Sequence, residues 1–177
     1  MKPLDYLLQE WRMRKVIPHI PQGASLLDIG CGDGALLRRL QGWISVGMGI
    51  DPAVQPSFHL FRGYFPQALP SGHIFDVITC LATLEHIPEA HLPLFCGACI
   101  SHLRPGGILL FTVPSPAVDV ILKGLRCLRL VDGMSLEEHH GFDTLRTPHL
   151  FPTLSLTRHQ RFQLGLNNLF VFTRAVA

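Results

Sequence analysis

The sequence predicts an α/β fold with a doubly wound, mainly parallel sheet that ends in an antiparallel hairpin. Short apolar segments alternate with helical segments along the chain, as in folds whose helices connect parallel strands. A glycine cluster, from Gly30 to Gly34, directly follows the first apolar segment. Near the C-terminus, two β-like runs flank Gly165-Leu166-Asn167-Asn168, a turn sequence typical of a hairpin.

Seven strands are expected, and the pattern of apolar residues along the chain sets their bounds. They are expected at 26–29, 44–50, 58–61, 75–81, 108–113, 154–162 and 169–173, with helices at 35–40 and 88–103. An N-terminal helix is expected up to about Pro18, because apolar residues recur there at helical spacing: Leu4, Leu7, Leu8 and Trp11. An amphipathic stripe at 118–128 and an irregular stretch at 131–152 separate the fifth and sixth strands.

Composition places the chain in a broad class and excludes some partners. Of 177 residues, 47% are hydrophobic and 16% are charged, which predicts one compact domain with a large core. The net charge is +2; residues 144–177 carry 4 Lys and Arg and no Asp or Glu. This weakly basic C-terminal segment is not the footprint of a nucleic-acid-binding protein.

Cysteine usage and hydropathy favour a cytoplasmic protein. The five cysteines are odd in number and lie in apolar stretches, which predicts a reducing compartment. The longest apolar run, Gly106 to Val113, is far shorter than the ~20 residues of a membrane span. The first residues lack the apolar core of a secretion signal. We therefore expect neither export nor membrane insertion.

The glycine cluster carries the clearest chemical signal. Asp28-Ile29-Gly30-Cys31-Gly32-Asp33-Gly34 has the spacing D-x-G-x-G-x-G at the end of a predicted buried strand. Glycines let the backbone approach a ligand closely, and the carboxyl ends of parallel strands face the crevice where open α/β sheets bind ligands. Asp51, at the end of the next strand, can accept two hydrogen bonds from ribose hydroxyls or cap the following segment, with Pro52 at its first position.

This turn alone leaves two interpretations open, because Gly30 to Ala35 also satisfies the dinucleotide-binding pattern G-x-G-x-x-A. The rest of the chain resembles the class I S-adenosylmethionine-dependent methyltransferases, which have a Rossmann-like fold. The matching pieces are Leu26 to Gly34, Gly49-Ile50-Asp51, Phe75-Asp76-Val77-Ile78, Leu84-Glu85-His86-Ile87-Pro88, Leu103-Arg104-Pro105-Gly106-Gly107 and the final hairpin.

The resemblance implies a cofactor, S-adenosyl-L-methionine, and a place for each part of it. Its methionine part would lie against Asp28 and the turn of Gly30, Cys31, Gly32, Asp33 and Gly34, and its ribose against Asp51 and Pro52. The loop of Tyr64 and Phe65 would flank adenine; Tyr64 stands where an acidic residue is common, which implies stacking and backbone contacts instead. Cys80 and Leu81 would touch the cofactor and face the acceptor.

The stretch from Cys80 to Pro88 looks most similar to quinone-biosynthesis and related small-molecule methyltransferases. Those that methylate oxygen hold a divalent metal with a glutamate three residues before the Glu-His pair. Ala82 stands at that position, so no metal is predicted. The resemblance implies a small-molecule acceptor, whose site we expect residues 1–20 and 116–152 of this single domain to cover.

Methyl transfer needs few catalytic side chains, because the reaction depends mainly on positioning. His86 and His139 are candidate bases for an acceptor that must lose a proton, although His86 could equally start a helix and His139 could lie in a solvated loop or lid. Two other functions stay open: an NAD-dependent oxidoreductase, and a non-catalytic subunit that keeps the fold.

Overall fold

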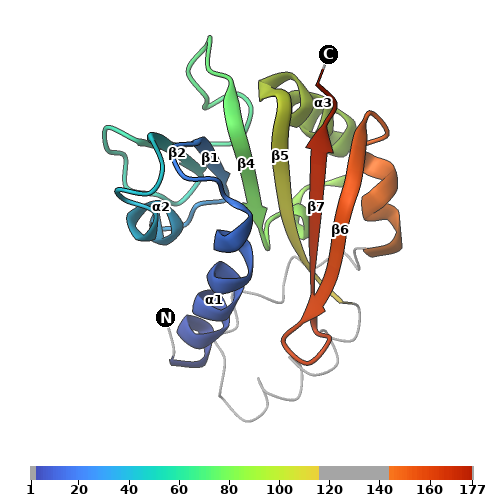
Figure 1. The fold of residues 1–177 in the computed structure, drawn as a ribbon. Coiled ribbons are helices and arrows are strands. Elements are labelled where there is room, and N and C mark those ends of the chain that lie inside the picture. Colours follow the sequence, from blue (N-terminus) through green and yellow to red (C-terminus); the bar gives the residue numbers. More distant parts are fainter. Residues whose placement is uncertain (1–2, 116–143, 177) are drawn as a thin grey trace.

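The computed structural model describes residues 3–115 and 144–176. Their strands form one seven-stranded sheet (Figure 1). Its strand order is β3-β2-β1-β4-β5-β7-β6. β1 to β5 pair in parallel, and β7 is antiparallel to both β5 and β6. The strands are β1 Ser25–Ile29, β2 Val46–Asp51, β3 Leu60–Arg62, β4 Phe75–Leu81, β5 Leu103–Pro114, β6 Leu154–Phe162 and β7 Asn167–Arg174. The predicted fold class is confirmed.

Helices cover both faces of this sheet. The described helices are α1 Pro3–Val16, α2 Ala35–Arg39 and α3 Leu92–His102, with 3-10 turns η1 Ile17–His19, η2 Leu84–His86, η3 Glu89–His91 and η5 Thr144–Leu150. On one face, Met13 and Val16 of α1 and Leu36 of α2 pack in one buried cluster. On the other face, Phe95 of α3 and Phe151, which follows η5, pack in a second cluster. The fold is therefore doubly wound.

The pleat of β4 shows how the two clusters divide the sheet. Val77 and Leu81 belong to the cluster under α1 and α2, while Ile78 and Cys80 belong to the cluster under α3. Ile29, the last residue of β1, pairs with Ile50 of β2 and with Cys80 of β4. The carboxyl ends of three parallel strands therefore meet at one edge.

Several predicted details differ from the structure. β5 begins at Leu103 and not at residue 108, so it includes the stretch predicted to end the preceding helix. The expected apolar face of α1 is largely exposed at Leu7 and Trp11, and the buried residues are Met13 and Val16 instead, because α1 rests on the sheet through its last turns. The hairpin turn precedes the predicted one: Asn167 and Asn168 already pair in β7. Their amide side chains are buried and hydrogen-bonded, which keeps them in the strand.

Some expectations concern residues that the structure does not describe. The stripe at 118–128 lies there, as does most of the expected cover at 116–152. The described end of that cover contributes to the core, because the Phe151 ring lies 5.0 Å from that of Phe111. In the described part of the chain, no helix is long and apolar enough to cross a membrane. The four cysteines of that part are free, buried thiols: Cys31, Cys80, Cys96 and Cys99.

Candidate cofactor and acceptor site

The glycine turn joins β1 to α2 at the carboxyl edge of the sheet. Gly30 has φ +73° and Gly32 has φ +56°, both in the left-handed region that favours glycine. A Cβ at Gly30 would lie 2.0 Å from Oγ1 of Thr83, so position 30 admits no side chain. A Cβ at Gly32 would meet no described atom within 4 Å. The turn is thus packed at its start and open in its middle, where a ligand could approach the backbone.

Asp51 ends β2 beside this open position. Its Oδ2 accepts a hydrogen bond from the backbone N–H of Gly32 at 2.9 Å, and its Oδ1 accepts one from Ala53 at 2.7 Å. Each carboxylate oxygen retains capacity for a further donor. Pro52 and Ala53 form a turn and not the helix start considered above, so Asp51 caps a turn while its carboxylate stays fixed next to the glycines.

Asp28 lies beneath the turn and is buried. Oγ1 of Thr79, on the neighbouring β4, donates to Oδ1 of Asp28 at 2.7 Å. Burial raises the pKa of Asp28 to about 7, the Thr79 hydrogen bond opposes this rise, and the negative charge of Asp51 adds to it. A cationic group above the turn would favour the ionised carboxylate.

A small hollow of about 50 Å³ opens between this turn and helix α1. Its lining comes from four segments: Gln9, Arg12, Met13, Asp28, Gly30, Cys31, Leu36 and Leu81. Gln9 and Arg12 have several rotatable bonds, so the room for a ligand depends on their rotamers. The predicted residues Asp28, Gly30, Cys31 and Leu81 are thus brought together, and α1 adds a wall that the motif does not indicate.

Two charged side chains of opposite sign, Arg12 and Glu85, have buried polar atoms, and Arg12 lines this hollow. Nε of Arg12 and Oε2 of Glu85 are buried, and neither has a hydrogen-bond partner among the described residues. Burial lowers the pKa of Arg12, and the charge of Glu85 opposes this. Burial raises the pKa of Glu85 to about 7, against its own backbone N–H and the charge of Arg12. Two unsatisfied atoms of opposite charge invite a ligand or water with both a donor and an acceptor.

The two aromatic side chains of the predicted adenine loop lie in different surroundings. Tyr64 is 73% exposed, whereas Phe65 is buried and its ring lies 5.6 Å from that of Phe95. A core position leaves the Phe65 ring unavailable for stacking on a ligand. Of the two, Tyr64 is the one that can reach adenine.

The remaining predicted residues occupy varied positions. Cys80 is fully buried toward α3, and Leu81 lines the hollow. The carboxylate of Asp33 pairs with Arg38 at 2.6 Å and is directed along α2. His86 is exposed in η2, while His139 lies outside the described residues. Within the described ranges, no group of three or more His, Cys, Asp or Glu side chains could hold a metal ion.

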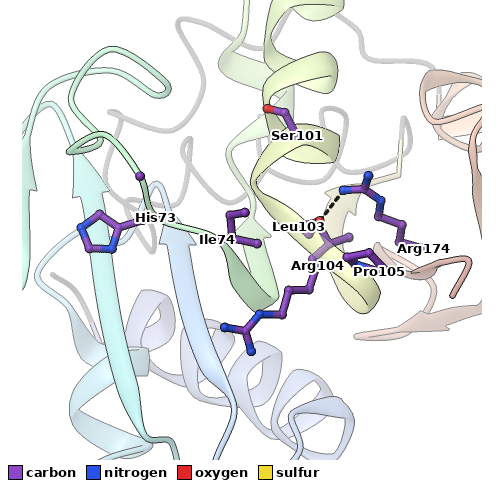
Figure 2. Close-up of a pocket in the computed structure, with 8 residues that line it drawn as sticks. His73, Ile74, Ser101, Leu103, Arg104, Pro105 and Arg174 are labelled. Atoms are coloured by element: carbon purple, nitrogen blue, oxygen red, sulfur yellow. Dashed lines mark hydrogen bonds between the residues drawn. The ribbon is translucent and has the colours of Figure 1, made fainter. Parts of the chain in front are cut away.

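A larger hollow, of about 510 Å³, lies at the opposite edge of the sheet (Figure 2). It surrounds the starts of β4 and β5, between Ile74 and Arg104, and its cations already have structural partners. Arg174 donates to the Ile100 and Leu103 carbonyls at the end of α3, and Arg104 pairs with Asp76 at 2.9 Å. This larger hollow lies at the amino ends of the strands, whereas the glycine turn lies at their carboxyl ends, so the two sites are separate.

Comparison with known proteins settles the family. A family model described as a methyltransferase domain matches residues 3–162, which is most of the chain. The chain belongs to this methyltransferase family. The match favours the methyltransferase interpretation of the glycine turn over the dinucleotide one, and it confirms the predicted resemblance.

Individual relatives of this methyltransferase domain agree with the assignment. The ubiquinone biosynthesis O-methyltransferase of Psychrobacter arcticus is 28% identical over 130 residues, covering 62% of this chain and 50% of the relative. That of Pseudomonas fluorescens is 32% identical over 104 residues, covering 51% and 44%. The chain thus spans about half the length of these curated relatives.

Solved structures confirm the methyltransferase fold. The N-methyltransferase NodS from Bradyrhizobium japonicum WM9 superposes with a TM-score of 0.69 at 16% identity, covering 97% of this chain and 98% of NodS. NodS in complex with S-adenosyl-L-homocysteine gives a TM-score of 0.65 at 17% identity, covering 98% and 88%.

Proposed function

We propose that this protein transfers a methyl group from S-adenosyl-L-methionine to a small-molecule acceptor. The observation that carries this proposal is the open backbone at Gly32 beside the fixed carboxylate of Asp51. Membership of the methyltransferase family supports it, and so does the similarity to NodS, which was solved with the reaction product of that cofactor.

The residues at the carboxyl edge fit the parts of this cofactor. The turn at Gly32 lacks a side chain that would block close approach, and Asp51 has acceptor capacity for ribose hydroxyls. Arg12 offers an unpartnered donor beside the hollow, which suits the carboxylate of the methionine part. The exposed Tyr64 can stack on adenine.

When bound, the cofactor supplies a methyl group activated by its positively charged sulfur. The task of this chain is then to position donor and acceptor, an effect that can contribute up to ~7–11 kcal/mol. An acceptor hydroxyl or amine that must lose a proton needs a base nearby. His86, which is exposed in η2 just after β4, is the described candidate for that role.

The acceptor side of the proposal rests on the relatives. The curated relatives are named as O-methyltransferases of ubiquinone biosynthesis, which supports a small-molecule acceptor, and NodS is named as an N-methyltransferase. We infer that the acceptor approaches past Leu81, beside α1. The buried free thiols support a reducing, cytoplasmic compartment.

The proposal predicts selective stabilisation by S-adenosylhomocysteine. A ligand that binds only the folded state stabilises it by about 2.7 kcal/mol at a hundredfold excess over Kd. Each kcal/mol moves the melting temperature of a domain of this size by roughly 2–4 °C. We therefore expect a rise of roughly 5–10 °C by differential scanning fluorimetry, with none from NAD or NADP at equal concentration. A rise with NAD alone would support an oxidoreductase, and no rise with any nucleotide would support a non-catalytic subunit.

Asp51→Ala should weaken S-adenosylhomocysteine binding by roughly tenfold to a few hundredfold, because each hydrogen bond to a carboxylate contributes ~1.5–3 kcal/mol. Isothermal titration calorimetry measures the loss. Glu89→Ala is the matched control, since Glu89 is an exposed carboxylate that pairs with Arg146 at 2.7 Å. Equal affinity of the Asp51 variant and the control would remove Asp51 from the ribose site.

A further inference from the structure

A side chain in the turn between β6 and β7 forms a hydrogen bond with helix α1. Nε2 of Gln163 donates a hydrogen bond to the backbone carbonyl of Leu8 at 2.8 Å. Gln163 is only 3% exposed, although it lies in a turn. Nδ2 of Asn167 donates to Oε1 of Gln163, which orients the amide so that its N–H groups face the helix. The contact joins residues that are 155 positions apart.

The contact holds the part of α1 that faces the hollow. In an α-helix the carbonyl of Leu8 also accepts the backbone N–H of Arg12, four residues later. Gln163 therefore fixes the turn of α1 that carries Gln9 and Arg12, two of the residues that line the hollow. The opposite side of this turn is held by an ion pair of Glu10 with Arg39 on α2 at 3.1 Å, and the next turn is held by the buried Met13.

The turn that carries Gln163 is itself bonded to the sheet. Oγ of Ser115, just after β5, donates to the carbonyl of Gly165 at 2.7 Å. Nδ2 of Asn168 in turn donates to that Ser115 oxygen at 2.9 Å. The turn is therefore a rigid support, tied to the end of β5.

The backbone of the turn shows that the Gln163 side chain is retained at a conformational cost. Gln163 has φ +50° and Leu164 has φ +58°, a region where residues other than glycine are strained. Glycine would suit both positions better. Leu164 is 93% exposed, so its side chain contributes little to the fold, whereas that of Gln163 makes the contact described above.

We propose that Gln163 is a positioning residue for cofactor binding, which holds α1 so that Gln9 and Arg12 close over the methionine part of the cofactor. This inference rests on the proposed function. Gln163 touches no part of the hollow itself; it acts through the Leu8 carbonyl and the helix turn above it.

The test uses two glycine substitutions that relieve the same backbone strain. Gln163→Gly removes the contact, and Leu164→Gly leaves it in place. Calorimetry with S-adenosylhomocysteine should give a Kd roughly three- to tenfold higher for Gln163→Gly, the range expected for losing one or two hydrogen bonds. Leu164→Gly should bind like the unaltered protein. Thermal unfolding should give a lower melting temperature for Gln163→Gly than for Leu164→Gly, because both substitutions relieve strain but only the first also removes the hydrogen bonds of Gln163.

A second measurement separates this proposal from the function on which it rests. Hydrogen exchange without ligand should be faster at the amides of residues 8–12 in Gln163→Gly, but unchanged in Leu164→Gly. Unchanged exchange there, or unchanged affinity, would overturn the positioning role. If the unaltered protein itself bound no S-adenosylhomocysteine, the proposed function would fail, and with it the link from Gln163 to the cofactor, whatever the exchange showed.

Discussion

Gly32→Ala should lower the affinity for S-adenosylhomocysteine by roughly five- to a hundredfold while the protein still folds. The added methyl group would meet no described protein atom within 4 Å, so the fold has room for it. That room is the space where the proposed cofactor approaches the backbone, and forcing an extra methyl into a close contact costs about 1–3 kcal/mol. The measurement is a calorimetric titration beside a urea unfolding curve.

Gly42→Ala is the control for this prediction. Gly42 has φ +80°, and a Cβ there would likewise meet no described atom within 4 Å. It lies in the turn between α2 and β2, away from the hollow. Both variants should lose about 1–2 kcal/mol of stability, because both force a side chain into the left-handed region. Only the Gly32 variant should lose affinity; an equal affinity in the two would place the cofactor elsewhere.

The site residues that lie in or directly after a strand could be predicted from the sequence. β4 has the predicted bounds, and the D-x-G-x-G-x-G spacing places Asp28 and Gly32 where the structure has them, because strand, turn and helix follow one another without interruption. Asp51 could be predicted for the same reason, as the last residue of the neighbouring strand. Local patterns suffice where the fold brings strand ends together.

The contacts that complete the site could not be predicted, because they join distant segments. Arg12 meets the charge of Glu85, and Gln163 meets the Leu8 carbonyl, with no local periodicity to indicate either. Leu7 illustrates the same limit: its spacing suggests a buried face of α1, but the docking of the helix leaves Leu7 62% exposed. Which side of a helix is buried depends on the tertiary structure.

Arg12→Met should destabilise the protein mainly at alkaline pH, because it removes a positive charge that favours the ionised form of the buried Glu85. Since the pKa of Glu85 is about 7, the uncompensated carboxylate can protonate, which limits the loss from this cause to under about 0.5 kcal/mol at pH 7 and to about 2 kcal/mol at pH 8.5. At pH 8.5 that corresponds to a fall in melting temperature of roughly 4–8 °C for a domain of this size. Affinity for S-adenosylhomocysteine should fall as well, because Arg12 is the proposed partner of its carboxylate.

The loss should depend on pH in a direction set by Glu85. The pKa of Glu85 is raised to about 7 in the folded protein, above its ordinary value, so the folded state holds a proton that the unfolded chain releases. Its contribution to stability is therefore greatest at acidic pH and declines as the pH rises through about 7. Without Arg12 the pKa of Glu85 rises further, and the decline continues to higher pH. Asp28 has a similarly raised pKa, but it is present in both proteins and cancels in the comparison.

Urea unfolding at pH 5.5, 7.0 and 8.5 tests this sign, and the double variant Arg12→Met/Glu85→Gln tests its cause. The difference in unfolding free energy between Arg12→Met and the unaltered protein should be smallest at pH 5.5 and largest at pH 8.5. The double variant should recover most of the stability at pH 8.5, because no charge is left buried, yet its affinity for S-adenosylhomocysteine should stay low. A loss that is equal at all three pH values would show that Glu85 does not feel the charge of Arg12. Recovery of affinity in the double variant would show that Arg12 does not bind the cofactor carboxylate.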